Sequence, residues 1–456
     1  MPRDLKWLYV IIYALFLVSC SPQASTQIPL GWIQISPEKS PPPSGQGAVA
    51  FVDSSNTAIL FGGITLDKWL NETWIWNGKT WYQESSVHTP PARAKLAMEY
   101  DKVRDRVVLF GGEMDKTLFN DTWEWDGKDW QLMNPTHKPP ARCCHAMAYD
   151  AINKNIIMYG GYDPNRNIFL SDMWKWDGKD WTEIHSDMPE MSGHTMVSFP
   201  ANNTIISVQT AGYGTWSWNG KAWKKIEGEN PPNRSEGKTT YDKNHNWIAF
   251  FGGISNTQLR NDTWVFDGHS WAALTLSNSP PARFGDVLFY DSKRESIIVF
   301  GGIGNNNTRF GDMWELRLPD TSFESLPTSM SYNGDWKGKT SQGLEITFTV
   351  AHGEIMAMKF QLKRKGQDCN QTSEFKMESK LSPTAEASGN FTPIHPIENG
   401  SFTVSENNPG TDGAAYTIFG EFLSPQKASG TIEYKVLSGN CQGTDKFDWS
   451  ATKVSP

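Results

Sequence analysis

The sequence has 456 residues, of which 38% are hydrophobic and 12% aromatic, and it contains 21 Trp, 39 Gly and 27 Pro. A chain of this length and composition has enough apolar material for more than one core. Abundant aromatic, Gly and Pro residues favour many short strands joined by tight turns over long helices. The formal net charge is −8 and no basic stripe is present, which argues against nucleic acid as a partner.

The first 20 residues form a separate segment. Arg3 and Lys6 precede an apolar run over residues 7–18. This run is too short to cross a bilayer, which takes about 20 apolar residues, and it fits the hydrophobic part of a secretory signal. We therefore expect an exported protein.

The end of this segment, Leu17-Val18-Ser19-Cys20, resembles a bacterial lipobox. The resemblance implies that residues 1–19 are a lipoprotein signal peptide and that Cys20 becomes the lipidated first residue of a tether over residues 20–31. The membrane, reached through this lipid on its outer face, is then one partner. A plain signal peptide with an incidental Cys is the alternative.

A repeat dominates the next 290 or so residues. A double glycine ends an apolar run in five places, with a period of about 49 residues, and Ala211-Gly212 marks a decayed copy between the third and the fourth. Unit 2 shows four strand-like pieces over residues 94–100, 106–110, 122–125 and 130–133. An Asn-Gly or Asp-Gly pair, typical of a two-residue hairpin, precedes the last strand in five units.

Paired tryptophans, such as Trp123 and Trp125, lie on one face of the third strand of a unit. Because they recur at the same place, we interpret them as core residues packed between neighbouring units and not as a sugar-stacking surface.

These units resemble kelch repeats, through the Pro-Pro-x-Arg entry, the double glycine, the Asn-Asp-Thr-Trp start of the third strand and the closing Trp. The resemblance covers residues 32–318 and implies a propeller of four-stranded blades. Residues 32–35 match a closing strand, yet they precede the first unit, while the last unit ends at its third strand near Trp314. We therefore predict an all-β protein with a six-bladed kelch-type β-propeller closed by its N-terminal strand.

The glycine pattern stops after the propeller. We expect a linker over residues 319–330 and a small antiparallel β-sandwich over residues 331–456, because segments such as 344–350 alternate apolar and polar residues. In an oxidising compartment Cys369 and Cys441 are the natural disulfide pair. The adjacent Cys143 and Cys144 are interpreted as packed thiols, with a strained vicinal disulfide as the alternative.

Four arginines share one position at the entry of blades 2, 3, 5 and 6, and four aspartates precede the third strand of the same blades. The arginines are Arg93, Arg142, Arg234 and Arg283, and the aspartates are Asp121, Asp172, Asp262 and Asp312. Blade 4 has Met191 and Gly214 instead, and blade 1 has Gly45 but keeps Glu72. Arginine and aspartate are both present in four blades and both absent from blade 4, which favours structural Arg–Asp pairs. The alternative is a ring of guanidinium groups that binds an acidic ligand at the channel mouth.

Blade 4 has a shortened loop, and His145 and His194 occupy equivalent places beside it, so a small ligand is expected there if one binds. No zinc spacing, phosphate loop or nucleophile elbow is present, and we predict no metal and no cofactor. The favoured function is a non-catalytic, extracytoplasmic binding or scaffold lipoprotein for a protein or glycan ligand. The alternative is a carbohydrate-active kelch enzyme, mutarotase-like or lyase-like, that uses Arg and acidic residues at the channel mouth.

Overall fold

The structure is a computed structural model. It describes residues 30–209, 213–228, 230–255, 257–323, 326, 334–351, 354–363, 372–378, 395–396, 401–408, 414–424, 427–436 and 443–454. Cys20, Cys369 and Cys441 lie outside these residues. Among the described residues, no helix has the length and apolar character needed to span a membrane.

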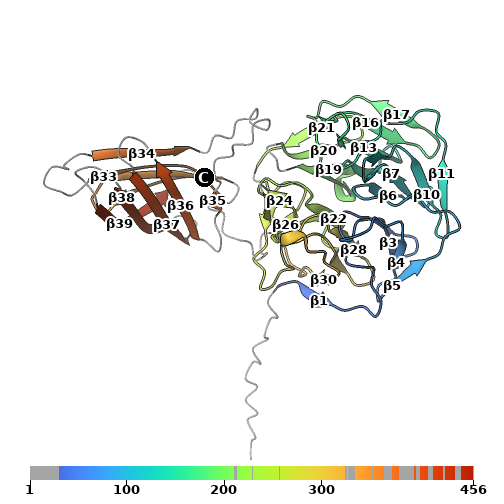
Figure 1. Ribbon diagram of the computed structural model, residues 1–456, viewed down its shortest axis with the longest axis horizontal. Coiled ribbons are helices and arrows are strands. Elements are labelled where there is room, and N and C mark those ends of the chain that lie inside the picture. Colours follow the sequence, from blue (N-terminus) through green and yellow to red (C-terminus); the bar gives the residue numbers. More distant parts are fainter. Residues whose placement is uncertain are drawn as a thin grey trace, which may run out of the picture.

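Six four-stranded antiparallel sheets form the blades of a propeller (Figure 1). Blade 1 contains β2 (Ala48–Val52), β3 (Thr57–Phe61), β4 (Thr73–Trp76) and β5 (Trp81–Glu84). Blade 2 contains β6 (Ala97–Asp101), β7 (Arg106–Phe110), β10 (Thr122–Trp125) and β11 (Trp130–Met133). Blade 3 contains β12 (Ala146–Asp150), β13 (Asn155–Tyr159), β16 (Met173–Trp176) and β17 (Trp181–Ile184).

The second half of the ring repeats this order. Blade 4 contains β18 (Thr195–Phe199), β19 (Thr204–Gln209), β20 (Gly214–Trp218) and β21 (Trp223–Ile226). Blade 5 contains β22 (Lys238–Asp242), β23 (Trp247–Phe251), β26 (Thr263–Phe266) and β27 (Trp271–Ala273). Blade 6 contains β28 (Val287–Asp291), β29 (Ser296–Phe300), β30 (Met313–Leu316) and, from the start of the chain, β1 (Ile33–Ile35).

The pairing of β1 with β30 confirms the predicted closure. Ile33 lies opposite Glu315 and Ile35 opposite Met313, so the first strand of the chain is the outer strand of the last blade. The preceding Trp32 is 1% exposed, and its indole N–H donates to Thr263 Oγ1 of blade 5 at 2.9 Å. The two ends of the propeller segment are thereby joined by both backbone and side chain.

The closing tryptophans of three other blades make the same contact, whereas Trp81 and Trp223 donate to the sulfur atoms of Met313 and Met173 in the preceding blade. Trp130 donates to Thr73, Trp181 to Thr122 and Trp271 to Thr215, each across to the preceding blade at 2.8–2.9 Å. All but Trp223 of the closing tryptophans are buried. These indoles are therefore core residues that join neighbouring blades, as the sequence pattern indicated.

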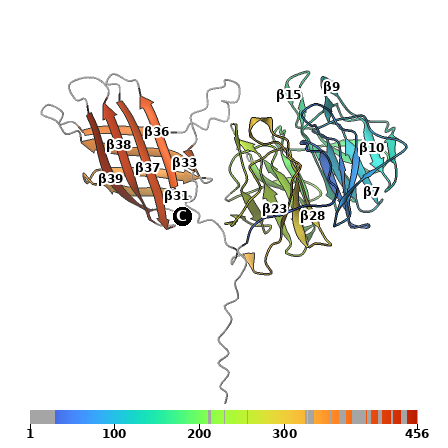
Figure 2. The ribbon, with the colours of Figure 1, turned by 60° about the horizontal axis from the view of Figure 1, so that its bottom comes forward.

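Three short hairpins stand on one end of the propeller, each after a double glycine (Figure 2). They are β8 (Glu113–Met114) with β9 (Thr117–Leu118), β14 (Tyr162–Asp163) with β15 (Ile168–Phe169), and β24 (Ile254–Ser255) with β25 (Gln258–Leu259). Two 3₁₀ turns, η1 (Pro200–Asn202) and η2 (Asn305–Asn307), complete the described part of this domain.

The C-terminal strands form a single nine-stranded antiparallel sheet. Its path is β34 (Thr372–Glu378), β33 (Glu354–Lys363), β32 (Glu345–Ala351), β31 (Gly334–Thr340), β39 (Gly443–Lys453), β38 (Lys427–Val436), β37 (Ala414–Ser424) and β36 (Ser401–Asn408), and β35 (His395–Pro396) pairs with β33. The predicted alternating segments lie in β32, β36, β37 and β38.

This sheet curls on itself. The ring of Phe348 in β32 lies 6.0 Å from that of Phe402 in the edge strand β36 and 5.7 Å from that of Trp449 in β39. One apolar cluster therefore lies between the two parts of the sheet. The expected sandwich is correct in its antiparallel strands and enclosed core, but its two layers belong to one continuous half-barrel sheet (Figure 2).

Trp32→Ala tests the closure. We expect a loss of about 3–5 kcal/mol in the free energy of unfolding, because a buried indole is removed and the closing strand loses its anchor. Ile33→Ala is the matched control in the same strand, since Ile33 is 62% exposed. Urea unfolding followed by Trp fluorescence measures both, and equal effects of the two changes would contradict the role of Trp32.

Candidate functional site

A ring of backbone hydrogen bonds surrounds one mouth of the central channel. Six equivalent residues, one before the first strand of each blade, adopt positive φ, and we call them the collar. They are Gln46, Lys95, Cys144, Gly193, Glu236 and Gly285. Each of five N–H groups donates to the carbonyl of the collar residue in the preceding blade, at 2.6–2.9 Å. The left-handed backbone aims each N–H at its neighbour, so the collar fixes the six blades to one another.

Two collar side chains span the mouth. Gln46 Nε2 donates to Glu236 Oε2 at 3.2 Å, passing over Gly285 of the intervening blade 6. A Cβ at Gly285 would lie 2.8 Å from Gln46 Cγ and 3.3 Å from the Glu236 carboxylate. Four other collar residues adopt the same positive φ with side chains, so it is the close approach of this bridge that excludes a side chain at Gly285.

The predicted arginines and aspartates meet inside their own blades. Each guanidinium contacts both carboxylate oxygens of its partner, as in Arg93–Asp121 at 2.6 and 2.8 Å and Arg283–Asp312 at the same distances. Arg142–Asp172 and Arg234–Asp262 have the same geometry. Each arginine also donates to the Pro carbonyl two residues earlier and to the first carbonyl of the double glycine.

The side chains of all four arginines are 0% exposed. Burial alone raises the pKa of each aspartate, but the paired guanidinium and a Trp indole N–H outweigh it, so all four aspartate pKa values lie below their ordinary value. The alternative of an arginine ring that grips a ligand at the channel mouth is therefore wrong, because the guanidinium groups are enclosed and bound within the blades.

Blades 1 and 4 lack the arginine, and in blade 1 another residue than expected takes its place. In blades 2, 3 and 6 the arginine carbonyl accepts an N–H of the double glycine in the preceding blade. In blade 1 the carbonyl of Ser44 accepts the N–H of Gly302 from blade 6 at 2.8 Å, so Ser44 and not Gly45 takes the arginine position. Glu72 still accepts the indole N–H of Trp74 at 3.0 Å. In blade 4 Met191 takes the arginine position, as expected, and it is fully buried.

His145 and His194 are packed between blades. The His145 ring lies edge-on to Phe110, with ring centres 5.6 Å apart, and the His194 ring lies edge-on to Tyr159 at 5.8 Å. Burial lowers the pKa of His194 to about 3, assisted by the charge of Lys238, and burial also lowers the pKa of His145 well below its ordinary value, assisted by the charge of Arg142. Both imidazoles are therefore neutral, and both line the central cavity described below. The expectation that a small ligand binds beside them stays a prediction.

Cys143 and Cys144 are free thiols whose Sγ atoms lie 2.9 Å apart. Adjacent side chains on a regular strand point to opposite faces, but Cys144 belongs to the collar with a φ of +62°, and the two sulfurs are in contact. The hydrogen bond from Cys144 and burial together raise the pKa of the Cys143 thiol. A strongly protonated, buried thiol is a poor nucleophile.

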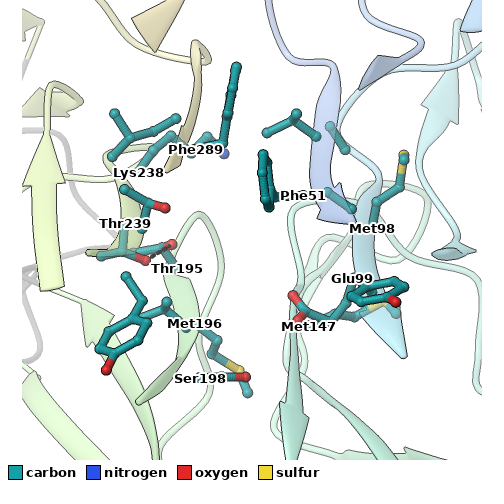
Figure 3. A pocket seen from close by; sticks show the side chains of 18 of the residues that line it. Phe51, Met98, Glu99, Met147, Thr195, Met196, Ser198, Lys238, Thr239 and Phe289 are labelled. Carbon is teal, nitrogen blue, oxygen red and sulfur yellow. Dashed lines mark hydrogen bonds between the residues drawn. The ribbon is translucent and has the colours of Figure 1, made fainter. Parts of the chain in front are cut away.

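The main cavity is the channel itself, with a volume of about 460 Å³, lined by the innermost strands of all six blades. Figure 3 shows Lys238, Thr239, Thr195 and Met196 on one wall and Phe51, Met98, Glu99 and Met147 on the other. The volume lies in the range of small-molecule sites, about 300–1,000 Å³. Among the described residues, no three His, Cys, Asp or Glu side chains are grouped as metal ligands.

Sequence reasoning missed the charged residues of the channel. Lys238 and Glu99 lie at positions where the other blades carry small or apolar residues, and that departure from the repeat was the available signal. Asp286 takes the position that His145 and His194 occupy in blades 3 and 4. Asp286 is fully buried, and neither of its carboxylate oxygens has a hydrogen-bond partner among the described residues. Burial raises its pKa to about 7, against the lowering effect of Arg283 and Lys238.

The chain is similar to known proteins in both sequence and structure. A family model described as the KLHDC2/KLHL20/DRC7 kelch-repeats domain matches residues 25–208 and 103–335. An F-box/kelch-repeat protein of Arabidopsis thaliana is 33% identical over 84 residues, which is 16% of this chain and 17% of that relative, so the chain spans well under two thirds of its length. A solved structure titled "Structure of YjhT" has a TM-score of 0.47 at 14% identity and covers 63% of this chain and 98% of its own.

The buried pairs predict a large cost for Arg142→Ala. Removing the guanidinium leaves Asp172 without its partner, and we expect a loss of about 3–5 kcal/mol in the free energy of unfolding. Arg166→Ala is the control in the same blade, because Arg166 is 57% exposed in its pair with Asp163; exposed pairs contribute about 0–1 kcal/mol. Similar losses in urea unfolding for both variants would contradict a structural role specific to the buried pair.

Asp286→Asn tests the unpaired carboxylate through pH. The folded pKa of about 7 exceeds the unfolded value, so the native state keeps its proton longer. Stability then falls as pH rises from about 4 to about 7 and is level beyond. The asparagine variant lacks this loss, so its stability relative to the native protein should increase across that window, by at most about 4 kcal/mol. A difference in urea unfolding that does not vary with pH would refute this assignment.

Proposed function

The chain belongs to the kelch-repeat family, and on that premise we propose that it is a non-catalytic binding or scaffold protein that presents the collar end of its propeller to a protein or glycan ligand. One observation carries the proposal: the collar is surrounded by loops that extend from successive blades at the same end. Isolated bridges tie the collar segments to these loops, as between Ala94 and Glu113 or Cys143 and Tyr162.

The surface formed by these loops has exposed apolar side chains. Phe169 is 49% exposed and Ile168 38% exposed in the blade 3 hairpin, and Leu66 in blade 1 is 72% exposed. The ring of Tyr162 lies 5.1 Å from that of Phe169 and supports it. Aromatic residues on a rigid base are the usual anchors of a protein or glycan interface. The enzyme alternative depends on arginines at the channel mouth, whereas these arginines form ion pairs with aspartates inside the blades.

The proposal includes export and a lipid on Cys20. Its support is the sequence: a positively charged start, an apolar run of signal length and the lipobox-like Leu17-Val18-Ser19-Cys20. A lipid at Cys20, followed by the short tether, would hold the propeller close to a membrane surface on the outer side. The disulfide between Cys369 and Cys441 remains part of the same proposal, since an exported domain meets an oxidising environment.

The loop surface is tested with the double variant Ile168→Ala/Phe169→Ala. Ligands of the native mature protein are first selected on a glycan array and from a displayed peptide library. We expect the double variant to bind them about tenfold or more weakly, since it lacks an exposed aromatic anchor.

Ile152→Ala is the matched control, because Ile152 is 51% exposed in the hairpin at the other end of the same blade. It should leave the affinity unchanged. Equal losses in the two variants would contradict binding at the collar end, and conversion of a bound glycan into a product would favour the enzyme alternative.

A further inference from the structure

The central channel contains two charged side chains that reach into the same space from opposite walls (Figure 3). Lys238 begins β22 in blade 5, and Glu99 lies in the middle of β6 in blade 2. These blades stand across the ring from each other, with two blades between them on either side. Both residues line the cavity and both are partly accessible from it.

The ammonium group of Lys238 has no direct partner in the cavity wall. Among the described residues, its ammonium group makes neither an ion pair nor a hydrogen bond. The carboxylate of Asp286 is close enough for the two charges to influence each other, but it is enclosed and does not contact Lys238. A partly buried ammonium without a partner is costly, and an anionic group in the cavity would remove that cost.

Glu99 shows the complementary situation. It makes no ion pair within the described structure, because the nearby Lys102 is bound to Asp53 at 3.2 Å. Burial raises the pKa of Glu99 to about 8, although Lys102 and the backbone N–H of Tyr149 favour the charged form and Asp53 and Asp101 oppose it. A cation placed against Glu99 would stabilise its carboxylate.

We propose that the channel binds a short linear zwitterion, with its carboxylate on Lys238 and its ammonium group on Glu99. The cavity is faced by an ammonium group without an ion-pair partner and by a carboxyl group that a nearby cation would ionise. One molecule that carries a carboxylate at one end and an ammonium group at the other matches both. Water also fits a cavity of this size, but it neutralises neither charge. The proposal concerns a site separate from the loop surface at the collar end.

The space between the two charges requires a slim and mostly apolar ligand. Met98, Met147 and Met196 form much of the wall, and Phe51 and Phe289 stack with ring centres 6.5 Å apart. Methionine side chains adapt to an alkyl chain of varying shape. The hydroxyls of Thr195 and Thr239 are already bonded to each other at 2.8 Å, so the ends of the ligand depend mainly on Lys238 and Glu99.

The ω-amino acids from glycine to 6-aminohexanoate are the probes, because their length measures the separation of the two charges. Calorimetric titration of the native protein should show one preferred chain length. Its two single-charge analogues, the alkanoate and the alkylamine of the same length, should each bind about tenfold or more weakly. If no member of the series binds better than its single-charge analogues, the proposal is wrong, whatever the variants show.

Two variants assign the ends of the ligand. In Lys238→Met the zwitterion should bind no better than the alkylamine, because the carboxylate has lost its partner, and in Glu99→Gln it should bind no better than the alkanoate. Lys243→Met is the control, since Lys243 is an exposed lysine at the far end of the same cavity. Full discrimination retained in Lys238→Met, or lost to the same degree in Lys243→Met, would overturn the assignment.

Discussion

The three-residue ladder between β1 and β30 is the contact on which the propeller depends. Without it blade 6 would lack its outer strand, and the apolar cluster that includes Trp32, Trp314 and Phe251 would open to water. Every blade packs against two neighbours, so a ring that opens at one interface weakens the whole circle. The collar supplies a second closure at the centre, where backbone hydrogen bonds run from blade to blade. The outer and inner closures together explain how blades with such short strands hold a rigid channel.

The buried Arg–Asp pair joins these two closures. The side chain of Arg142 binds inside blade 3, while its backbone carbonyl accepts the N–H of Gly112 from blade 2 at 2.9 Å. A Cβ at Gly111 would lie 2.8 Å from that carbonyl oxygen, and the equivalent glycines lie as close to the carbonyls of Met191 and Ser44, so the double glycine is needed whichever residue takes the arginine position. A buried ion pair adds little net stability compared with apolar packing. Its advantage here is geometric, since a two-pronged contact fixes the loop that carries the collar residue.

Most of the propeller could be predicted because the same residue pattern recurs in each blade. A feature that is unclear in one blade can be identified from the others. The predictions failed where a residue acts outside the pattern. In the sequence, either Ser44 or Gly45 can be aligned with the arginines of the other blades. Only the hydrogen bond from the N–H of Gly302 identifies Ser44 as the equivalent residue. The positive φ of Cys144 has no signature in a Cys-Cys pair. The single curled sheet of the C-terminal domain depends on pairing between distant strands, β31 with β39, which alternation within each strand does not reveal.

The sequence shows Lys238 and Glu99 as departures from the repeat, but only the closed ring shows that they face one cavity from opposite walls. The collar end of the channel is spanned by the Gln46–Glu236 bridge, whereas the far end of the cavity is lined by Asp53, Lys102 and Lys243 at the hairpin tips. A small ligand would therefore enter from the far end, because the rigid blades do not part to admit it. A large partner on the loop surface would then leave that entrance open, so the two proposed sites can be occupied together. Binding at one should change the affinity of the other only through the collar, which lies between them.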